Sequence, residues 1–119
     1  MPSLTVRHES WPLRGSFAIS RGSKTASEVV VAEIADDALV GRGECVPYPH
    51  YGESVAGVVG AIENLSAAVA GDLDRIGLLE LLPPGAARNA LDCALWDLEA
   101  KIAGRRVWDL AGLDAPTDV

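Results

Sequence analysis

The chain has 119 residues, 49% of them hydrophobic, which is enough for one domain with its own core and too little for two. Its net charge of −7 argues against nucleic acid and anionic membranes as partners, because both are usually bound by basic surfaces. The N-terminus has no signal-peptide pattern, no apolar run approaches the roughly 20 residues that span a bilayer, and two cysteines are too few for a disulfide scaffold. We therefore expect a cytoplasmic domain.

The first part of the sequence predicts an antiparallel three-stranded meander within residues 3–46. Alternation of apolar and polar residues, or a run of β-branched residues, marks three strands. These are residues 4–13, 27–35 and 38–44. Pro12 places the first strand at a sheet edge, and the pair Asp36 and Asp37 predicts the turn between the second and third strands.

The second part predicts helices. Three segments have apolar residues at helical spacing, and they are residues 54–71, 72–82 and 86–104. Ser54 is a suitable N-cap for the first of them, and Gly104 ends the last. Strands followed by helices predict an α+β domain with a helical layer on the sheet. We assign residues 1–104 to this domain (sheet 3–46, helices 54–104) and residues 105–119, which include a short helical turn, to a linker.

Short motifs in the chain favour structural interpretations over catalytic ones. The stretch "GRGE" at 41–44 lacks the third glycine and the following helix of a dinucleotide site, so it predicts a strand end that another backbone approaches closely. Asp92 and Asp97 lie about 140° apart around a helix and cannot share one face. We expect Asp97 to form a surface ion pair with Lys101, and Asp92 to bind a loop backbone.

The two histidines and the remaining polar residues form no complete catalytic or metal site. No cluster of cysteine, histidine or carboxylate residues has metal-ligand spacing. We expect His8 to be structural. His50 lies in a loop stiffened by Pro47 and Pro49, where it is either structural or in contact with a ligand.

The segment "RGSFAISRGSKTAS" at 14–27 carries three cations among small residues, Arg14, Arg21 and Lys24. It is interpreted either as a solvated, mobile loop or as an adaptable lid whose cations pair with a carboxylate.

Three stretches together have a more specific pattern: "WPLRGSFAISRGSKT", "GRGECVPYPHYGES" and "PPGAARNALDCALWDLEAK". In their order and spacing they resemble the N-terminal capping domain of the enolase superfamily, in its muconate-lactonising subgroup. Within that subgroup the chain is most similar to the L-Ala-D/L-Glu dipeptide epimerases. The resemblance implies a cap over a (β/α) barrel that is absent from this chain. On the barrel, Mg²⁺ and two lysines would perform a 1,1-proton transfer at the glutamate α-carbon.

This resemblance implies substrate-binding residues in the chain but no catalytic residue and no metal ligand, so the chain alone is expected to be inactive. The implied substrate loops are residues 15–26 and 45–53. The substrate-binding residues are Phe17, Ile19, Arg21, Lys24, Tyr48, His50 and Tyr51. Arg21, and after it Lys24, would hold the side-chain carboxylate, while Phe17 would contact the apolar part of the substrate together with Ile19.

The resemblance also implies the partners. They are the protein's own C-terminal barrel, a small acidic dipeptide from cell-wall peptide turnover and, at full length, further copies in a symmetric homo-oligomer. Two alternatives stay open. The same cap serves muconate cycloisomerases and o-succinylbenzoate synthases, whose substrates are also carboxylates. A free-standing, non-catalytic binding or assembly module is the other alternative.

Overall fold

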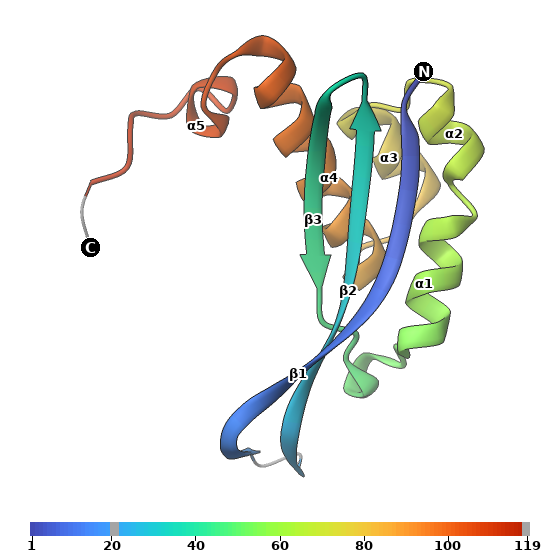
Figure 1. Cartoon of the computed structure of the whole chain (residues 1–119), viewed down its shortest axis with the longest axis vertical. Coiled ribbons are helices and arrows are strands. Elements are labelled where there is room, and N and C mark those ends of the chain that lie inside the picture. The colour runs from blue at the N-terminus through green and yellow to red at the C-terminus, as the bar shows by residue number, and fades with distance from the viewer. Residues whose placement is uncertain (20–21, 118–119) are drawn as a thin grey trace.

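The computed structural model describes residues 1–19 and 22–117, and of Ile19 only the backbone. Three strands form one antiparallel sheet in the order β1-β2-β3, and helices α1 to α4 lie against one of its faces (Figure 1). This arrangement confirms the predicted α+β class, and the described residues contain no (β/α) barrel. In chain order the elements are β1 (Ser3–Ile19), β2 (Gly22–Asp36), β3 (Leu39–Cys45), η1 (Pro49–Tyr51), α1 (Val55–Glu63), α2 (Ser66–Ala70), α3 (Arg75–Leu81), α4 (Ala86–Ala103) and α5 (Val107–Leu110).

The first two strands are much longer than the third and form a ribbon that extends beyond the sheet. β1 pairs with β2 along their length, apart from a register shift between Pro12 and Phe17. β3 pairs only with residues 30–36 of β2, so the rest of the ribbon projects from the lower end of the sheet (Figure 1). Pro12 lies in the edge strand β1, as predicted, where its missing N–H costs no central ladder bond.

The prediction of a loop at residues 14–27 is wrong for most of the segment that the structure describes, because β1 and β2 extend into it. Phe17 pairs with Lys24 and Ala18 with Ser23, so both strands continue through this segment. Glycine and serine have low strand propensity, which is why the local sequence predicts a loop. The pairing begun by the preceding residues of β1 and β2 nevertheless carries the ladder on.

The helix predicted at 54–71 is divided into α1 and α2. Ser54 caps α1 as predicted, because its side chain accepts a hydrogen bond from the amide of Gly57. At the break, the Ser66 hydroxyl donates to the carbonyl of Glu63 at 2.8 Å. Gly57 and Gly60 lower the helix propensity of this segment. The Ser66 hydroxyl satisfies the Glu63 carbonyl, which the break leaves without a helical partner.

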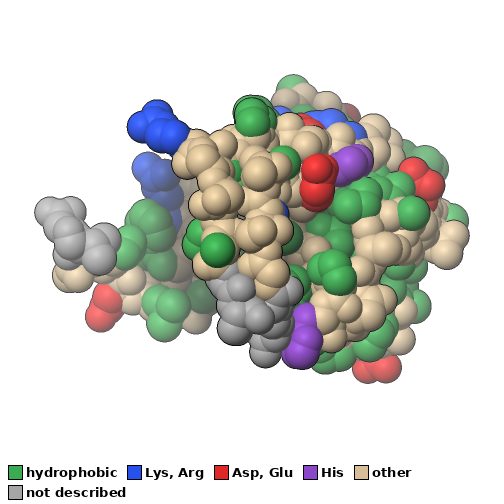
Figure 2. Space-filling view, turned by 90° about the horizontal axis from the view of Figure 1, so that it is seen from below, with side chains coloured by type: hydrophobic (Ala, Val, Ile, Leu, Met, Phe, Trp, Pro, Cys, Tyr) green, Lys and Arg blue, Asp and Glu red, His purple; other side chains and the backbone are tan. Residues whose placement is uncertain are grey.

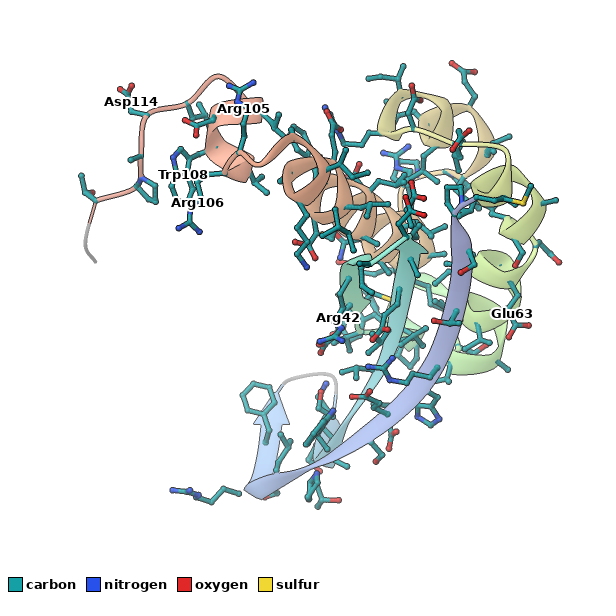
Figure 3. All side chains as sticks on the ribbon, turned by 45° about the horizontal axis from the view of Figure 1, so that its top comes forward. Arg42, Glu63, Arg105, Arg106, Trp108 and Asp114 are labelled. Carbon is teal, nitrogen blue, oxygen red and sulfur yellow. The ribbon has the colours of Figure 1, made fainter. Side chains whose placement is uncertain are left out.

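The later helices follow the prediction closely. Asp74 caps α3 by accepting from the Gly77 amide at 2.7 Å. α4 ends at Gly104, which has the left-handed φ of 65° expected of a glycine stop. α5 lies within the segment predicted as a linker and contacts α4. It stands apart from the sheet, and the labelled side chains of Arg106 and Trp108 show its place in Figure 3.

The core lies between the sheet and the helices, with α4 packed on β3 and β2. The sequence pattern predicts one buried face of β2 at Val30, Ala32 and Ile34, and that face is buried, as are Val29 and Val31 on the other face. The pattern also predicts an apolar stripe on α4, of Ala87, Leu91, Ala94, Leu95, Leu98 and Ile102, and most of it is buried. The buried members are Val30, Ala32 and Ile34 of β2 and Leu91, Ala94, Leu95 and Leu98 of α4. Ile102, at the end of the predicted stripe, is exposed because the sheet does not extend that far along the helix.

Two glycines of β3 allow the backbone of α4 to lie directly on the sheet. A Cβ atom at Gly43 would be 1.8 Å from the carbonyl oxygen of Ala90, and one at Gly41 would be 2.2 Å from that of Ala94. No side chain fits at such distances, so both positions require glycine. The close backbone approach predicted for "GRGE" is confirmed, although the strand continues through it to its end.

The edge of β3 that faces away from β2 is closed by two side chains of α4. Asp97 accepts from the amide of Arg42 at 2.9 Å, and Lys101 donates to the carbonyl of Val40 at 2.6 Å. Asp97 and Lys101 also form the predicted ion pair, with N and O atoms 3.0 Å apart. The loop-backbone contact expected of Asp92 is not found among the described residues; Asp97 instead binds the backbone of a strand, because it faces the edge of β3. Covering an open edge in this way protects it from pairing with another chain.

A charged network crosses all three strands on the face of the sheet away from the helices. The Glu33 carboxylate of β2 accepts from the guanidinium of Arg7 at 2.6 Å and from that of Arg42 at 2.9 Å. These bonds, with that from Arg7 the larger cause, hold the pKa of Glu33 below its usual value.

In the described part of the chain, no helix has the length and apolar character needed to cross a membrane.

Candidate functional site

The two segments implied to face a substrate meet at one end of the molecule. Between the β1–β2 ribbon and the turn after β3 lies an open pocket of about 600 Å³. Figure 2 looks onto this end, where hydrophobic side chains gather beside the ribbon and both histidines are visible on the same face. Four of the seven residues implied to bind substrate line the pocket, namely Phe17, Lys24, Tyr48 and His50.

The ribbon supplies one wall. Phe17 and Lys24 are cross-strand partners, so their side chains lie on the same face of the ribbon. Phe17 is 54% exposed, which leaves much of its ring available for contact with a ligand. The side chain of Ile19 and all of Arg21 lie outside the described residues, so their roles stay predictions.

The turn after β3 supplies the opposite wall. Its 3-10 helix η1 begins directly after Tyr48 and ends at Gly52, whose φ of 75° is left-handed and therefore suits glycine. The ring of Tyr48 lies 5.9 Å from that of His50 and 5.2 Å from that of Tyr51, measured between centroids. Tyr51 is 73% exposed and is not among the residues that line the pocket, so its role also stays a prediction.

Both carboxylates that line the pocket are already occupied by other groups of the chain. Glu28 accepts from the Ser10 hydroxyl at 2.8 Å and lies 2.6 Å from Nε2 of His8. The hydrogen bond from Ser10 and, after it, that from His8 lower the pKa of Glu28. The structural role predicted for His8 agrees with this contact. Glu53 accepts hydrogen bonds from two backbone amides.

Lys24 is not committed in this way. Among the residues that the structure describes, no carboxylate lies within ion-pair distance of its ammonium group. The pocket therefore combines a cation, aromatic rings and carboxylates that are occupied by internal donors. This combination suits a small molecule that carries an anionic group beside an apolar portion.

Glu28 and Glu53 are pocket residues that sequence reasoning did not find. For Glu28 a signal exists, because it lies two positions before the buried Val30 on the strand 27–35 and therefore shares the face of the buried residues. For Glu53 no local signal exists, since one of its partners, Ala86, is 33 positions away in the sequence.

The described residues do not assemble a metal site. Nowhere among them do three histidine, cysteine, aspartate or glutamate side chains come together as ligands of an ion. Both cysteines are free, with Cys45 buried and Cys93 exposed. Burial, with a smaller contribution from Glu53, raises the pKa of Cys45 to about 11, so its thiol is protonated at neutral pH.

Residues 1–112 match the family described as "Mandelate racemase / muconate lactonizing enzyme, N-terminal domain". The whole chain is 45% identical to part of the L-Ala-D/L-Glu epimerase of Escherichia coli (strain K12), of which it covers 37%.

Solved structures show the same fold. An enolase family member from Agrobacterium tumefaciens, homologous to dipeptide epimerases and solved with sodium and L-Ala-L-Glu, has a TM-score of 0.93 and 48% identity; 97% of this chain covers 36% of that one. A dipeptide epimerase from Enterococcus faecalis V583, complexed with Mg and L-Leu-L-Tyr, has a TM-score of 0.78 and 28% identity, over 91% of this chain and 33% of that one. The chain thus spans about a third of the length of these relatives.

Proposed function

This chain belongs to the mandelate racemase / muconate lactonizing enzyme N-terminal domain family of the enolase superfamily, and we propose that it is the substrate-specificity cap of a dipeptide epimerase. The proposed substrate is an L-Ala-D/L-Glu dipeptide from cell-wall peptide turnover in the cytoplasm. The proposed reaction is a 1,1-proton transfer at the glutamate α-carbon.

The observation that carries this proposal is the pocket between ribbon and turn. Lys24, without an acidic partner among the described residues, offers a charge for the glutamate side chain, and Phe17 and Tyr48 offer aromatic surface for its methylenes. The similarity to a structure that holds L-Ala-L-Glu, at 48% identity, supports an acidic dipeptide over other carboxylates.

The cap would bind and orient the substrate, while the proton transfer would take place on a (β/α) barrel. Nothing among the described residues forms a metal site, so we assign Mg²⁺ to the barrel. What this chain would contribute is an aromatic wall and a cation for the side-chain carboxylate of the residue whose α-carbon reacts. Binding energy gained there would hold that carbon in place for reaction elsewhere.

Deuterium exchange by the complete protein, the cap with its barrel, tests this function. In D₂O with Mg²⁺, we expect the α-proton of the glutamate in L-Ala-L-Glu to be replaced, and the NMR signal of L-Ala-D-Glu to appear. L-Ala-L-Lys serves as the matched dipeptide of opposite charge and is expected to exchange more slowly. Turnover of cis,cis-muconate without exchange in any dipeptide would instead identify a muconate cycloisomerase.

A further inference from the structure

The carboxylate of Glu53 joins two segments that are far apart in the sequence. One oxygen accepts from the amide of Tyr48 at 3.0 Å, and the other accepts from the amide of Ala86 at 2.8 Å. Tyr48 precedes η1 in the wall of the pocket, whereas Ala86 is the first residue of α4. A single, partly buried side chain therefore holds the pocket wall against the start of the longest helix.

A carboxylate is the group that this position requires. The N-cap of α4 is Gly85, which has no side chain to offer the free amides of the first turn, and Glu53 takes that place. A carboxylate presents two acceptor oxygens, whereas a glutamine side chain presents one oxygen and one donor group. Glutamine at residue 53 would therefore turn a donor toward one of the two backbone amides and lose that bond.

The space around the carboxylate is also fitted to it. A Cβ atom built at Gly85 would lie 3.1 Å from the second oxygen of Glu53, so a side chain there would crowd the carboxylate. The carboxylate of Glu53 can therefore reach the amide of Ala86 because residue 85 is a glycine.

The turn that Glu53 holds is a compact unit. The Tyr51 amide donates to the Tyr48 carbonyl at 3.0 Å, and the Gly52 amide donates to the Pro49 carbonyl at 2.9 Å. The rings of Tyr48, His50 and Tyr51 contact one another within it. Because the turn is bonded internally, displacing its anchor would move the aromatic wall as a group.

We infer that Glu53 is a positioning residue, which sets the aromatic wall of the pocket by tying the turn at Tyr48 to the start of α4 at Ala86. This inference rests on the proposed function for its effect on substrate, but its structural part does not. The role differs from that of Lys24, since Glu53 would act through the turn and would not touch the substrate.

The structural part is tested on this chain by amide hydrogen exchange of Glu53→Gln. We expect the amide of Ala86 or of Tyr48 to exchange about tenfold faster or more, as expected for the loss of a hydrogen bond to a charged group, while the amides of β2 keep their rates. Glu63→Gln is the matched control, because Glu63 lies on the outer side of α1 (Figure 3). Unchanged rates at both amides in Glu53→Gln would overturn the inference. Should Glu53→Gln not fold, Glu53→Asp, which keeps both acceptors at shorter reach, is read at the same two amides by the same criterion.

The functional part is tested in the complete protein with L-Ala-L-Glu. We expect Glu53→Gln to raise KM by about tenfold, a larger factor than its reduction of kcat, because the wall contributes to binding and not to the chemical step. Glu53→Asp should recover part of this loss, and Glu63→Gln should show none. Equal KM values for Glu53→Gln and the unaltered protein would overturn the role in the pocket. If the unaltered protein epimerises no dipeptide, the proposed function fails, while amide exchange still decides whether Glu53 holds the turn.

Discussion

At the scale of single residues, the charged groups of the pocket divide into those that hold the fold and one that is open to a ligand. Glu28 and Glu53 each bind two donor groups of the chain, whereas Lys24 has no acidic partner among the described residues. Lys24 could be selected from the sequence because it is a cation among small residues. The hydrogen bonds of the two glutamates could not be predicted, because Glu28 binds residues of another strand and Glu53 binds the first residue of α4.

Replacing Lys24 by glutamine in the complete protein should weaken binding of acidic dipeptides. Loss of a charge-assisted bond to the substrate carboxylate predicts a KM for L-Ala-L-Glu about 10- to 100-fold higher, with little change for a neutral dipeptide such as L-Ala-L-Leu. Arg14→Gln is the control, since Arg14 lies on the same ribbon but does not line the pocket. An unaltered preference for the acidic dipeptide in Lys24→Gln, with a lost preference in Arg21→Gln, would transfer the role to Arg21.

The Glu33 carboxylate predicts a dependence of stability on pH. Its pKa in the folded chain is lowered, chiefly by the hydrogen bond from Arg7, so its contribution is present above the unfolded value of about 4.3 and is lost as the pH falls through the folded value. Glu33→Gln should therefore be less stable than the unaltered chain at pH 7, and the difference should shrink between pH 5 and pH 3. Urea unfolding at a series of pH values measures this. A difference that stays constant over that range, as expected for Glu63→Gln, would contradict it.

At the scale of elements, the contact between α4 and β3 shows what local sequence can and cannot predict. The apolar stripe from Leu91 to Leu98 predicts α4 and its buried face, because each residue recurs at helical spacing. The tightness of the contact depends on glycines in another element. The extension of the β1–β2 ribbon to Phe17 and Lys24 was missed for a similar reason, since pairing with a partner strand overrides a weak local preference.

Two glycine replacements should change the free energy of unfolding in opposite directions, and the first of them tests the contact between α4 and β3. Gly43→Ala should destabilise the chain by about 3 kcal/mol or more, at the upper end of the range for overpacked cores, because its Cβ would overlap the carbonyl of Ala90. Gly60→Ala in α1 has nothing within 4 Å of its Cβ and should stabilise by about 1 kcal/mol through helix propensity. Urea unfolding followed by circular dichroism measures both. A Gly43→Ala chain within about 1 kcal/mol of the unaltered one would show that α4 can move off the sheet.

At the scale of the whole molecule, the fold brings an N-terminal ribbon and a turn some 30 positions later to the same end. The meander brings these two segments together, because β3 runs back beside β2 and ends near the base of the ribbon (Figure 1). The order of strands and helices was predictable from periodicity and turn residues. The pocket itself was implied by resemblance, since no spacing in the sequence reports that residues 17 and 48 face one space.

The proposed function is tested most directly by deuterium exchange into L-Ala-L-Glu, with the cap and its barrel prepared separately and then mixed with Mg²⁺. We expect exchange at the glutamate α-carbon from the mixture and none from this chain alone, because no catalytic residue is assigned to it. Circular dichroism of each part beforehand establishes that both are folded. Exchange by the 119-residue chain without the barrel, or no exchange from a folded mixture, would contradict the role of this chain as the cap of a dipeptide epimerase.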